Sequence, residues 1–201
     1  MSKSDTIFVD IDTQNDFLDN KGSLYILQSE NIRINLAKLI NFAVKNDITL
    51  ISTMDSHSEN DPEFREFSPH CIPGTWGWQK IPETTYDNYQ IIEPQEINHL
   101  ELKTNKFIIK KPQISAFSNP NTMKLIKALN KRNFVVFGVA TDYCVKQFTL
   151  GLLKENFLVQ LVEDAIAGIN DLSTEYAIVQ MVNHGAKLVK TEEIISKLEE
   201  K

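Results

Sequence analysis

The sequence has few cysteines and no long apolar run. Its 201 residues include only two cysteines, too few for a disulfide framework, and such a low count is typical of a reducing compartment. The apolar stretches are far shorter than the roughly 20 residues that a membrane-spanning helix needs, and the N-terminus has none of the features of a signal peptide. We therefore expect a cytoplasmic protein with no membrane partner.

An excess of basic residues is also missing. Lys and Arg number 21 and Asp and Glu number 27, so the formal net charge is −6. This balance argues against a nucleic-acid groove and against binding to an anionic membrane surface. A chain of this length is long enough to bury a substantial core, so we expect residues 1–201 to form a single domain with no nucleic-acid partner.

Short apolar runs, rich in β-branched residues, alternate with segments of helical periodicity. Strands are predicted at residues 6–12, 48–53, 107–111, 133–140, 158–162 and 186–190. Helices are predicted at residues 30–45, 120–130 and 173–184, directly after Cys144, and at the C-terminus. This alternation is typical of a parallel sheet covered by helices on both faces. The predicted fold is therefore a three-layer, Rossmann-like α/β fold with a mainly parallel six-stranded sheet.

Residues 55–94 break this alternation. They contain five prolines and both tryptophans of the chain, and they show little periodicity. A long irregular stretch in a compact protein is usually a lid or a binding loop. We expect part of the functional site there.

Cys144 is the first candidate for chemistry. It follows the predicted strand at 133–140 by a few residues, and Val145, Phe148 and Leu152 after it have helical spacing. The thiol is thus expected at or near a helix N-terminus, where unpaired N–H groups and the helix dipole favour the reactive thiolate. The alternative is a small buried apolar residue with no chemical role.

Charged residues stand at the ends of other predicted strands. The first strand ends with Asp10 and Asp12, the second leads to Asp55, and the third ends with Lys110 and Lys111. Ligands bind at this edge of a parallel sheet. Alternation places Asp10 and Asp12 on one face, with Asp12 nearer the edge, and it allows only one of the two lysines to face the site. An Asp–Lys pair beside a thiol would stabilise the thiolate and move its proton.

Asp55-Ser-His57 and the later His70 form a candidate metal site. They offer one carboxylate and two imidazoles, a set that suits zinc, manganese or iron. His70 lies in a proline-flanked turn that would hold its side chain in a fixed direction.

Five segments of the chain, in order, resemble the isochorismatase-like cysteine hydrolases, and within that family the nicotinamidases, also called pyrazinamidases. They are Asp12-Thr-Gln-Asn-Asp-Phe17, Asp55-Ser-His57, Ser68-Pro-His-Cys-Ile-Pro-Gly-Thr75, Lys111-Pro-Gln-Ile-Ser-Ala-Phe117 and Gly138-Val-Ala-Thr-Asp-Tyr-Cys-Val145. The resemblance implies an enzyme that hydrolyses nicotinamide to nicotinate and ammonia through a cysteine thioester, in NAD salvage. It also implies a homo-oligomer.

The resemblance assigns roles to single residues. It implies a catalytic triad of Asp12, Lys111 and Cys144, which selects Lys111 over Lys110. It further implies a cis peptide bond before Ala140, and an oxyanion hole made by the backbone N–H groups of Ala140 and Cys144.

The resemblance also implies one divalent ion, zinc before manganese or iron, that would hold the pyridine nitrogen of the substrate. Its ligands would be Asp55, His57 and His70, with Glu63 as a further carboxylate. Expected substrate contacts are Phe17 and Phe67, which would sandwich the ring, together with Ala140 and Tyr143.

Two rival functions remain open. One is another amide hydrolase of the same family, acting on an N-carbamoyl or ureido substrate. The metal-ligand set favours nicotinamide over it, since several relatives lack a metal. The other is a non-catalytic metal-binding scaffold, against which the intact triad argues.

Overall fold

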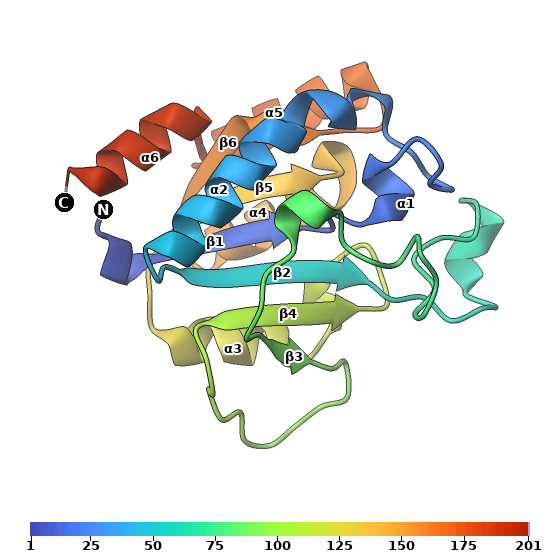
Figure 1. The fold of residues 1–201 in the computed structure, drawn as a ribbon, viewed down its shortest axis with the longest axis horizontal. Coiled ribbons are helices and arrows are strands. Elements are labelled where there is room, and N and C mark those ends of the chain that lie inside the picture. The colour runs from blue at the N-terminus through green and yellow to red at the C-terminus, as the bar shows by residue number, and fades with distance from the viewer. Residues whose placement is uncertain (201) are drawn as a thin grey trace.

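A seven-stranded parallel sheet forms the middle layer of the computed structural model, which describes residues 1–200 (Figure 1). Its strands are β1 (Thr6–Ile11), β2 (Thr49–Asp55), β3 (Gln90–Ile92), β4 (Lys106–Lys111), β5 (Asn133–Val139), β6 (Leu158–Ala167) and β7 (Lys187–Val189). Their order across the sheet is β3-β4-β2-β1-β5-β6-β7, with every pair parallel. The predicted α/β class with a parallel sheet is confirmed.

Helices cover both faces of this sheet. They are α1 (Asn15–Leu18), α2 (Arg33–Lys45), α3 (Thr122–Leu129), α4 (Lys146–Lys154), α5 (Asp171–Asn183) and α6 (Thr191–Glu199). In Figure 1, α2 lies in front of the sheet and α3 and α4 lie behind it. Short 3-10 helices occupy η1 (Lys3–Asp5), η2 (Leu27–Ile32), η3 (Pro62–Arg65), η4 (Pro82–Thr84) and η5 (Ala116–Ser118), and η6 (Thr141–Val145) is a π-helical turn. None of the helices within residues 1–200 has the length and apolar character needed to cross a membrane.

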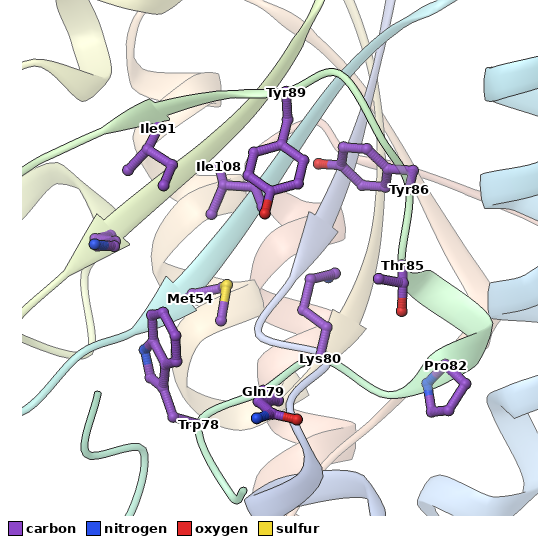
Figure 2. Close-up of a pocket in the computed structure, with 11 residues that line it drawn as sticks. Met54, Trp78, Gln79, Lys80, Pro82, Thr85, Tyr86, Tyr89, Ile91 and Ile108 are labelled. Carbon is purple, nitrogen blue, oxygen red and sulfur yellow. The ribbon is translucent and has the colours of Figure 1, made fainter. Parts of the chain in front are cut away.

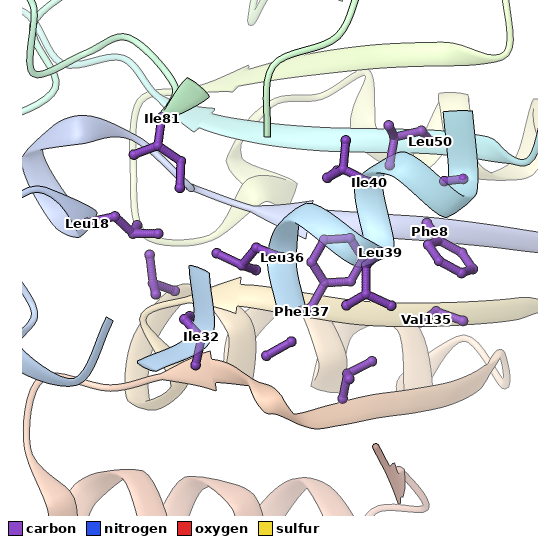
Figure 3. Close-up of a cluster of buried hydrophobic side chains, with 14 of the residues drawn as sticks. Phe8, Leu18, Ile32, Leu36, Leu39, Ile40, Leu50, Ile81, Val135 and Phe137 are labelled. Carbon is purple, nitrogen blue, oxygen red and sulfur yellow. The ribbon is translucent and has the colours of Figure 1, made fainter. Parts of the chain in front are cut away.

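The helices are fixed to the sheet by two apolar layers. Leu36, Leu39 and Ile40 recur at helical spacing on α2 and are buried against the sheet (Figure 3). Phe148 of α4 and Met181 of α5 belong to the layer on the other face. Burial of one such side chain contributes about 1.5–3 kcal/mol, so these layers hold the strands, and the residues at their ends, in a rigid arrangement.

The prediction of six strands was one short. The missed strand, β3, has only three residues and lies at the edge of the sheet, beside β4. Its middle residue, Ile91, is 43% exposed. A strand of this length is too short for an alternating pattern to identify it. The rest of residues 55–94 is irregular apart from the end of β2 and the 3-10 helices η3 and η4, as expected.

The prediction that Asp10 and Asp12 share one face of the sheet was wrong. Asp10 accepts a hydrogen bond from the Ser52 hydroxyl at 2.7 Å, and Asp12 accepts one from the Thr53 hydroxyl at 2.6 Å. Ser52 and Thr53 are successive residues of β2 and so point to opposite faces. The physical reason is that β1 ends at Ile11, and Asp12 has a left-handed φ of 48° that turns its side chain away from the strand pattern.

Candidate active site and metal centre

Lys111 lies at the centre of the site. Its side chain is completely buried, and its Nζ contacts Asp12 Oδ2 at 2.9 Å, Cys144 Sγ at 3.5 Å and, more closely still, Asp55 Oδ1. Burial alone would lower the pKa of Lys111, but the charges of Asp12 and Asp55 raise it well above its ordinary value. Lys110 points to the other face of the sheet, where its Nζ is 2.6 Å from Glu93. The structure thus brings Lys111, and not Lys110, to the thiol.

Asp12 is a buried carboxylate whose polar partners include Lys111, Thr53 and the Cys144 thiol. Burial raises the pKa of Asp12 from its ordinary 3.8 to about 6, although Lys111 acts in the opposite direction. A carboxyl group with a pKa in this range can both accept and return a proton near neutral pH. The chain reaches this geometry because Gly138 of β5 lies directly beside Ile11, where a Cβ atom would stand 2.2 Å from the Ile11 carbonyl oxygen.

Cys144 lies in the π-helical turn between β5 and α4, near the start of this helical segment. The peptide bond between Val139 and Ala140 is cis, as the resemblance implies. The carbonyl of Ala140 accepts hydrogen bonds from the N–H groups of Tyr143 and Val145, both at 3.1 Å. These bonds hold the turn that carries the thiol.

The sequence predicts that Lys111 and the helix terminus favour the Cys144 thiolate, but burial acts more strongly on the pKa of the thiol. Burial raises the pKa of the Cys144 thiol well above its ordinary range, and the positive charge of Lys111 does not offset this effect. The sequence indicated the helical turn and the lysine but not the desolvation of the sulfur. Desolvation here has the larger effect on the pKa of the thiol. Burial thus favours the protonated thiol over the thiolate.

Four potential metal ligands converge beside this group. Ligand atoms of Asp55, His57 and His70 all lie within 4.8 Å of one another. Glu63, from the 3-10 helix η3, places its Oε1 3.9 Å from the Nε2 atoms of both histidines. Burial opposes ionisation of Asp55, but Lys111 and His57 together lower its pKa, so its oxygens are negatively charged.

The orientation of the two imidazoles fits a metal ion. The Nε2 atom of His57 is buried and has no hydrogen-bond partner among residues 1–200. The Nδ1 atoms lie near other acceptors: His57 Nδ1 is 3.2 Å from an oxygen of Asp61, and His70 Nδ1 is 2.8 Å from the carbonyl of Ser68. Metal-binding histidines use one nitrogen for the ion and the other for such an outer contact. Two Nε2 atoms and two carboxylates thus form a donor set suited to a borderline divalent ion.

Three residues that support the site were not identified from the sequence. Gln14 holds the backbone of Asp55 on both sides: its Oε1 accepts from the Asp55 N–H at 2.8 Å, and its Nε2 donates to the Asp55 carbonyl at 3.0 Å. Asp16 accepts from the N–H of Cys71 at 2.7 Å and so fixes the turn next to His70. Asp61 lies beside His57, as described above. Gln14 and Asp16 are in the first quoted segment, but no sequence pattern indicated which backbone groups they bind.

A small cavity opens over Cys144 and the metal-ligand cluster. Each of the four predicted substrate contacts, Phe17, Phe67, Ala140 and Tyr143, lines it. The rings of Phe67 and Tyr143 pack edge to face, with centroids 5.8 Å apart. Further lining residues are Asp55, Glu63, His70 and Cys144, together with Leu24, Ile114 and Ile169, which the sequence did not indicate. The thiol and three of the four potential metal ligands therefore face the same space.

A family model for the isochorismatase domain matches residues 6–97 and 92–193. The chain therefore belongs to the isochorismatase family of hydrolases. A curated relative, the uncharacterized isochorismatase family protein PncA of Bacillus subtilis, is 28% identical over 180 residues, which are 86% of this chain and 92% of the relative.

Solved structures show the same fold. Pyrococcus horikoshii pyrazinamidase in complex with zinc has a TM-score of 0.77 and 26% identity, and the match covers 92% of this chain and 99% of that one. N-carbamoylsarcosine amidase from Thermoplasma acidophilum has a TM-score of 0.75 and 22% identity, with 92% and 96% of the two chains covered. The same fold thus occurs in a pyrazinamidase and in an N-carbamoylsarcosine amidase.

Proposed function

We propose that this protein is a cysteine-dependent amidohydrolase that converts nicotinamide to nicotinate and ammonia, a step of NAD salvage. The observation that carries the proposal is the contact of Lys111 Nζ with both Cys144 Sγ and Asp12, directly beside the cluster of Asp55, His57, His70 and Glu63. The sequence likeness to a pyrazinamidase supports it, because pyrazinamide and nicotinamide are both primary amides of nitrogen-containing rings.

In the proposed reaction, Asp12 acts as the general base and general acid. Above about pH 6 its carboxylate is ionised while the Cys144 thiol is protonated. The carboxylate accepts the thiol proton as the sulfur attacks the amide carbon, and it gives that proton to the departing ammonia. A thioester remains on Cys144. Asp12 then accepts a proton from the attacking water, the C–S bond breaks, and Asp12 gives this proton to the departing sulfur, which restores the Cys144 thiol and releases nicotinate, whose own proton passes to the ammonia or to solvent.

The reaction also requires stabilisation of the negative charge that forms on the carbonyl oxygen when the sulfur attacks. The backbone N–H groups of Ala140 and Cys144, which flank the proposed reaction centre, are the proposed oxyanion donors. Loss of one donor of this kind typically slows an enzyme by about 10²- to 10³-fold. Lys111 stays protonated and keeps Asp12 aligned with the sulfur.

Asp55, His57, His70 and Glu63 would hold one divalent ion, zinc before manganese or iron. When bound, the ion supplies a Lewis-acidic anchor for the ring nitrogen of the substrate. Phe17, Phe67 and Tyr143 flank the ring, and Ala140 lies at the amide. We further propose that residues 1–201 act as a single hydrolase domain in a cytoplasmic homo-oligomer.

The main alternative is hydrolysis of an N-carbamoyl or ureido compound, because N-carbamoylsarcosine amidase has the same fold. Such a substrate has no ring nitrogen for the metal cluster to anchor. A non-catalytic metal-binding scaffold would not require the contacts of Lys111 with the thiol.

Ammonia release distinguishes these functions. Purified protein is treated with a chelator, and zinc, manganese or iron is then added back. We expect release from nicotinamide that depends on the added metal, with at most weak release from benzamide, which has the same shape without the ring nitrogen. Equal turnover of both amides would argue against metal anchoring. Turnover of N-carbamoylsarcosine alone would establish the alternative, and no turnover of any of the three with any metal would refute the proposal.

A further inference from the structure

A second and larger pocket lies on the opposite face of β2 and β4 from the candidate active site. Its volume is about 440 Å³, within the range of pockets that bind small molecules. Met54 and Ile108 contribute to it from the strands, and Trp78, Tyr86 and Tyr89 contribute from the irregular segment, as Figure 2 shows. Among residues 1–200, no side chain lines both this pocket and the catalytic cavity.

Tyr86 and Trp78 contribute ring surface rather than polar groups. The Tyr86 hydroxyl is already used, since it donates to Ser52 at 2.9 Å and lies 3.1 Å from the carbonyl of Phe107. The indole N–H of Trp78 donates to the Ser56 hydroxyl at 3.0 Å. With these polar atoms engaged elsewhere, the pocket offers flat apolar walls, which suit a planar ring.

Lys110 gives the pocket a positive charge. Its Nζ lies 5.7 Å from the centroid of the Trp78 ring. Its partner, Glu93, has a half-exposed side chain, and ion pairs of this kind contribute little, so another carboxylate can replace it at low cost. Lys80, the other lysine of the pocket, is held by the buried Asp10 and by the Thr13 hydroxyl. Lys110 is therefore the cation suited to a ligand.

We propose that this pocket binds a planar aromatic carboxylate, with its ring between Trp78 and Tyr89 and its carboxylate at Lys110 Nζ. The pocket is joined to the candidate active site by covalent neighbours and by one hydrogen bond. Met54 and Lys110 directly precede Asp55 and Lys111. The Trp78 carbonyl accepts a hydrogen bond at 2.9 Å from Gln14 Nε2, the group that also holds Asp55. The ligand would therefore lie directly behind the catalytic residues.

Calorimetric titration of the metal-loaded full-length protein with 2-naphthoate tests the proposal, with 2-naphthylmethanol as the uncharged probe. Lys110→Gln should weaken naphthoate binding by about tenfold, the typical effect of losing a charged hydrogen-bond partner, and should leave binding of the alcohol unchanged. Tyr89→Ala should weaken binding of both probes by about three- to tenfold. Tyr89 is 44% exposed, so its truncation preserves the core.

Matched control variants test whether naphthoate binds in this pocket and not elsewhere on the protein. Lys124→Gln removes a lysine paired with the exposed Glu96, and Tyr176→Ala removes an exposed tyrosine of α5. Neither should change naphthoate binding, nor should Phe67→Ala in the catalytic cavity. Absence of binding to the parent protein, unchanged binding in Lys110→Gln and Tyr89→Ala, or loss of binding in Phe67→Ala would overturn the proposal. None of these results depends on nicotinamide being the substrate.

Discussion

The hydrogen bond from Thr53 to Asp12 should lower the pH below which the enzyme loses activity. The hydroxyl donates to Asp12 Oδ1 at 2.6 Å inside the protein, and it stabilises the ionised carboxylate that must accept the thiol proton. Thr53→Val keeps the shape of the side chain and removes the donor. The protonated carboxyl group is then favoured, so the pKa of Asp12 should rise.

The size of the shift follows from the type of bond. A hydrogen bond to a charged group is worth about 1.5–3 kcal/mol, and about 1.4 kcal/mol corresponds to one pH unit. Lys111 stays in contact with Asp12, so we take the lower end and expect a rise of about 1 pH unit, from about 6 to about 7. Activity at pH 6 should then fall about fivefold relative to the parent enzyme, with almost no change at pH 8.5.

The assay is kcat/KM for nicotinamide from pH 5 to 9 in the metal-loaded enzyme. Ser52→Ala is the matched control, because Ser52 is the preceding residue of β2 and donates to Asp10 instead of Asp12. The acid limb should move in Thr53→Val and stay in place in Ser52→Ala. An acid limb that is unchanged in Thr53→Val, or that moves equally in both variants, would refute the role of Asp12 as the base.

Three further variants test the parts of the site that surround the triad. Asp61→Asn should weaken metal binding by about 10- to 100-fold in a competition titration, as is typical when the outer carboxylate beside a metal-binding histidine is replaced, and Glu59→Gln, at an exposed position, should not. His57→Ala should lose the bound metal on dialysis, and metal content equal to that of the parent would contradict its role as a ligand. Gln14→Leu leaves the buried N–H and carbonyl of Asp55 without their partner, so urea unfolding should show a loss of about 1–3 kcal/mol; an unchanged midpoint would show that these bonds do not support the site.

The sequence predicted the parallel sheet because its central strands are long and apolar. It missed β3 because three residues at an edge carry no usable periodicity. It also left the choice between Lys110 and Lys111 open, and only the family resemblance selected Lys111. The register of β4 on β2 explains this selection physically, since Lys111 pairs with Asp55 at the end of the strand and is buried.

The sequence-based predictions for the site failed where burial or backbone conformation determines the outcome. The left-handed φ of Asp12 separates it from Asp10, and strand alternation does not reveal such a turn. Desolvation raises the pKa of the Cys144 thiol, and a sequence shows the neighbouring charge of Lys111 but not the loss of water around the sulfur. Gln14 was missed because it acts on backbone atoms of Asp55, which are present in every residue and carry no signal.

The most direct test of the proposed chemistry is the search for a covalent intermediate on Cys144. Metal-loaded enzyme is mixed with nicotinamide, quenched with acid during turnover, digested and examined by mass spectrometry. We expect a nicotinoyl group on the peptide that contains Cys144, and no such group in Cys144→Ala, which should keep the fold and lose turnover. Ammonia release by Cys144→Ala at the parent rate, or a nicotinoyl group on another residue, would contradict the account.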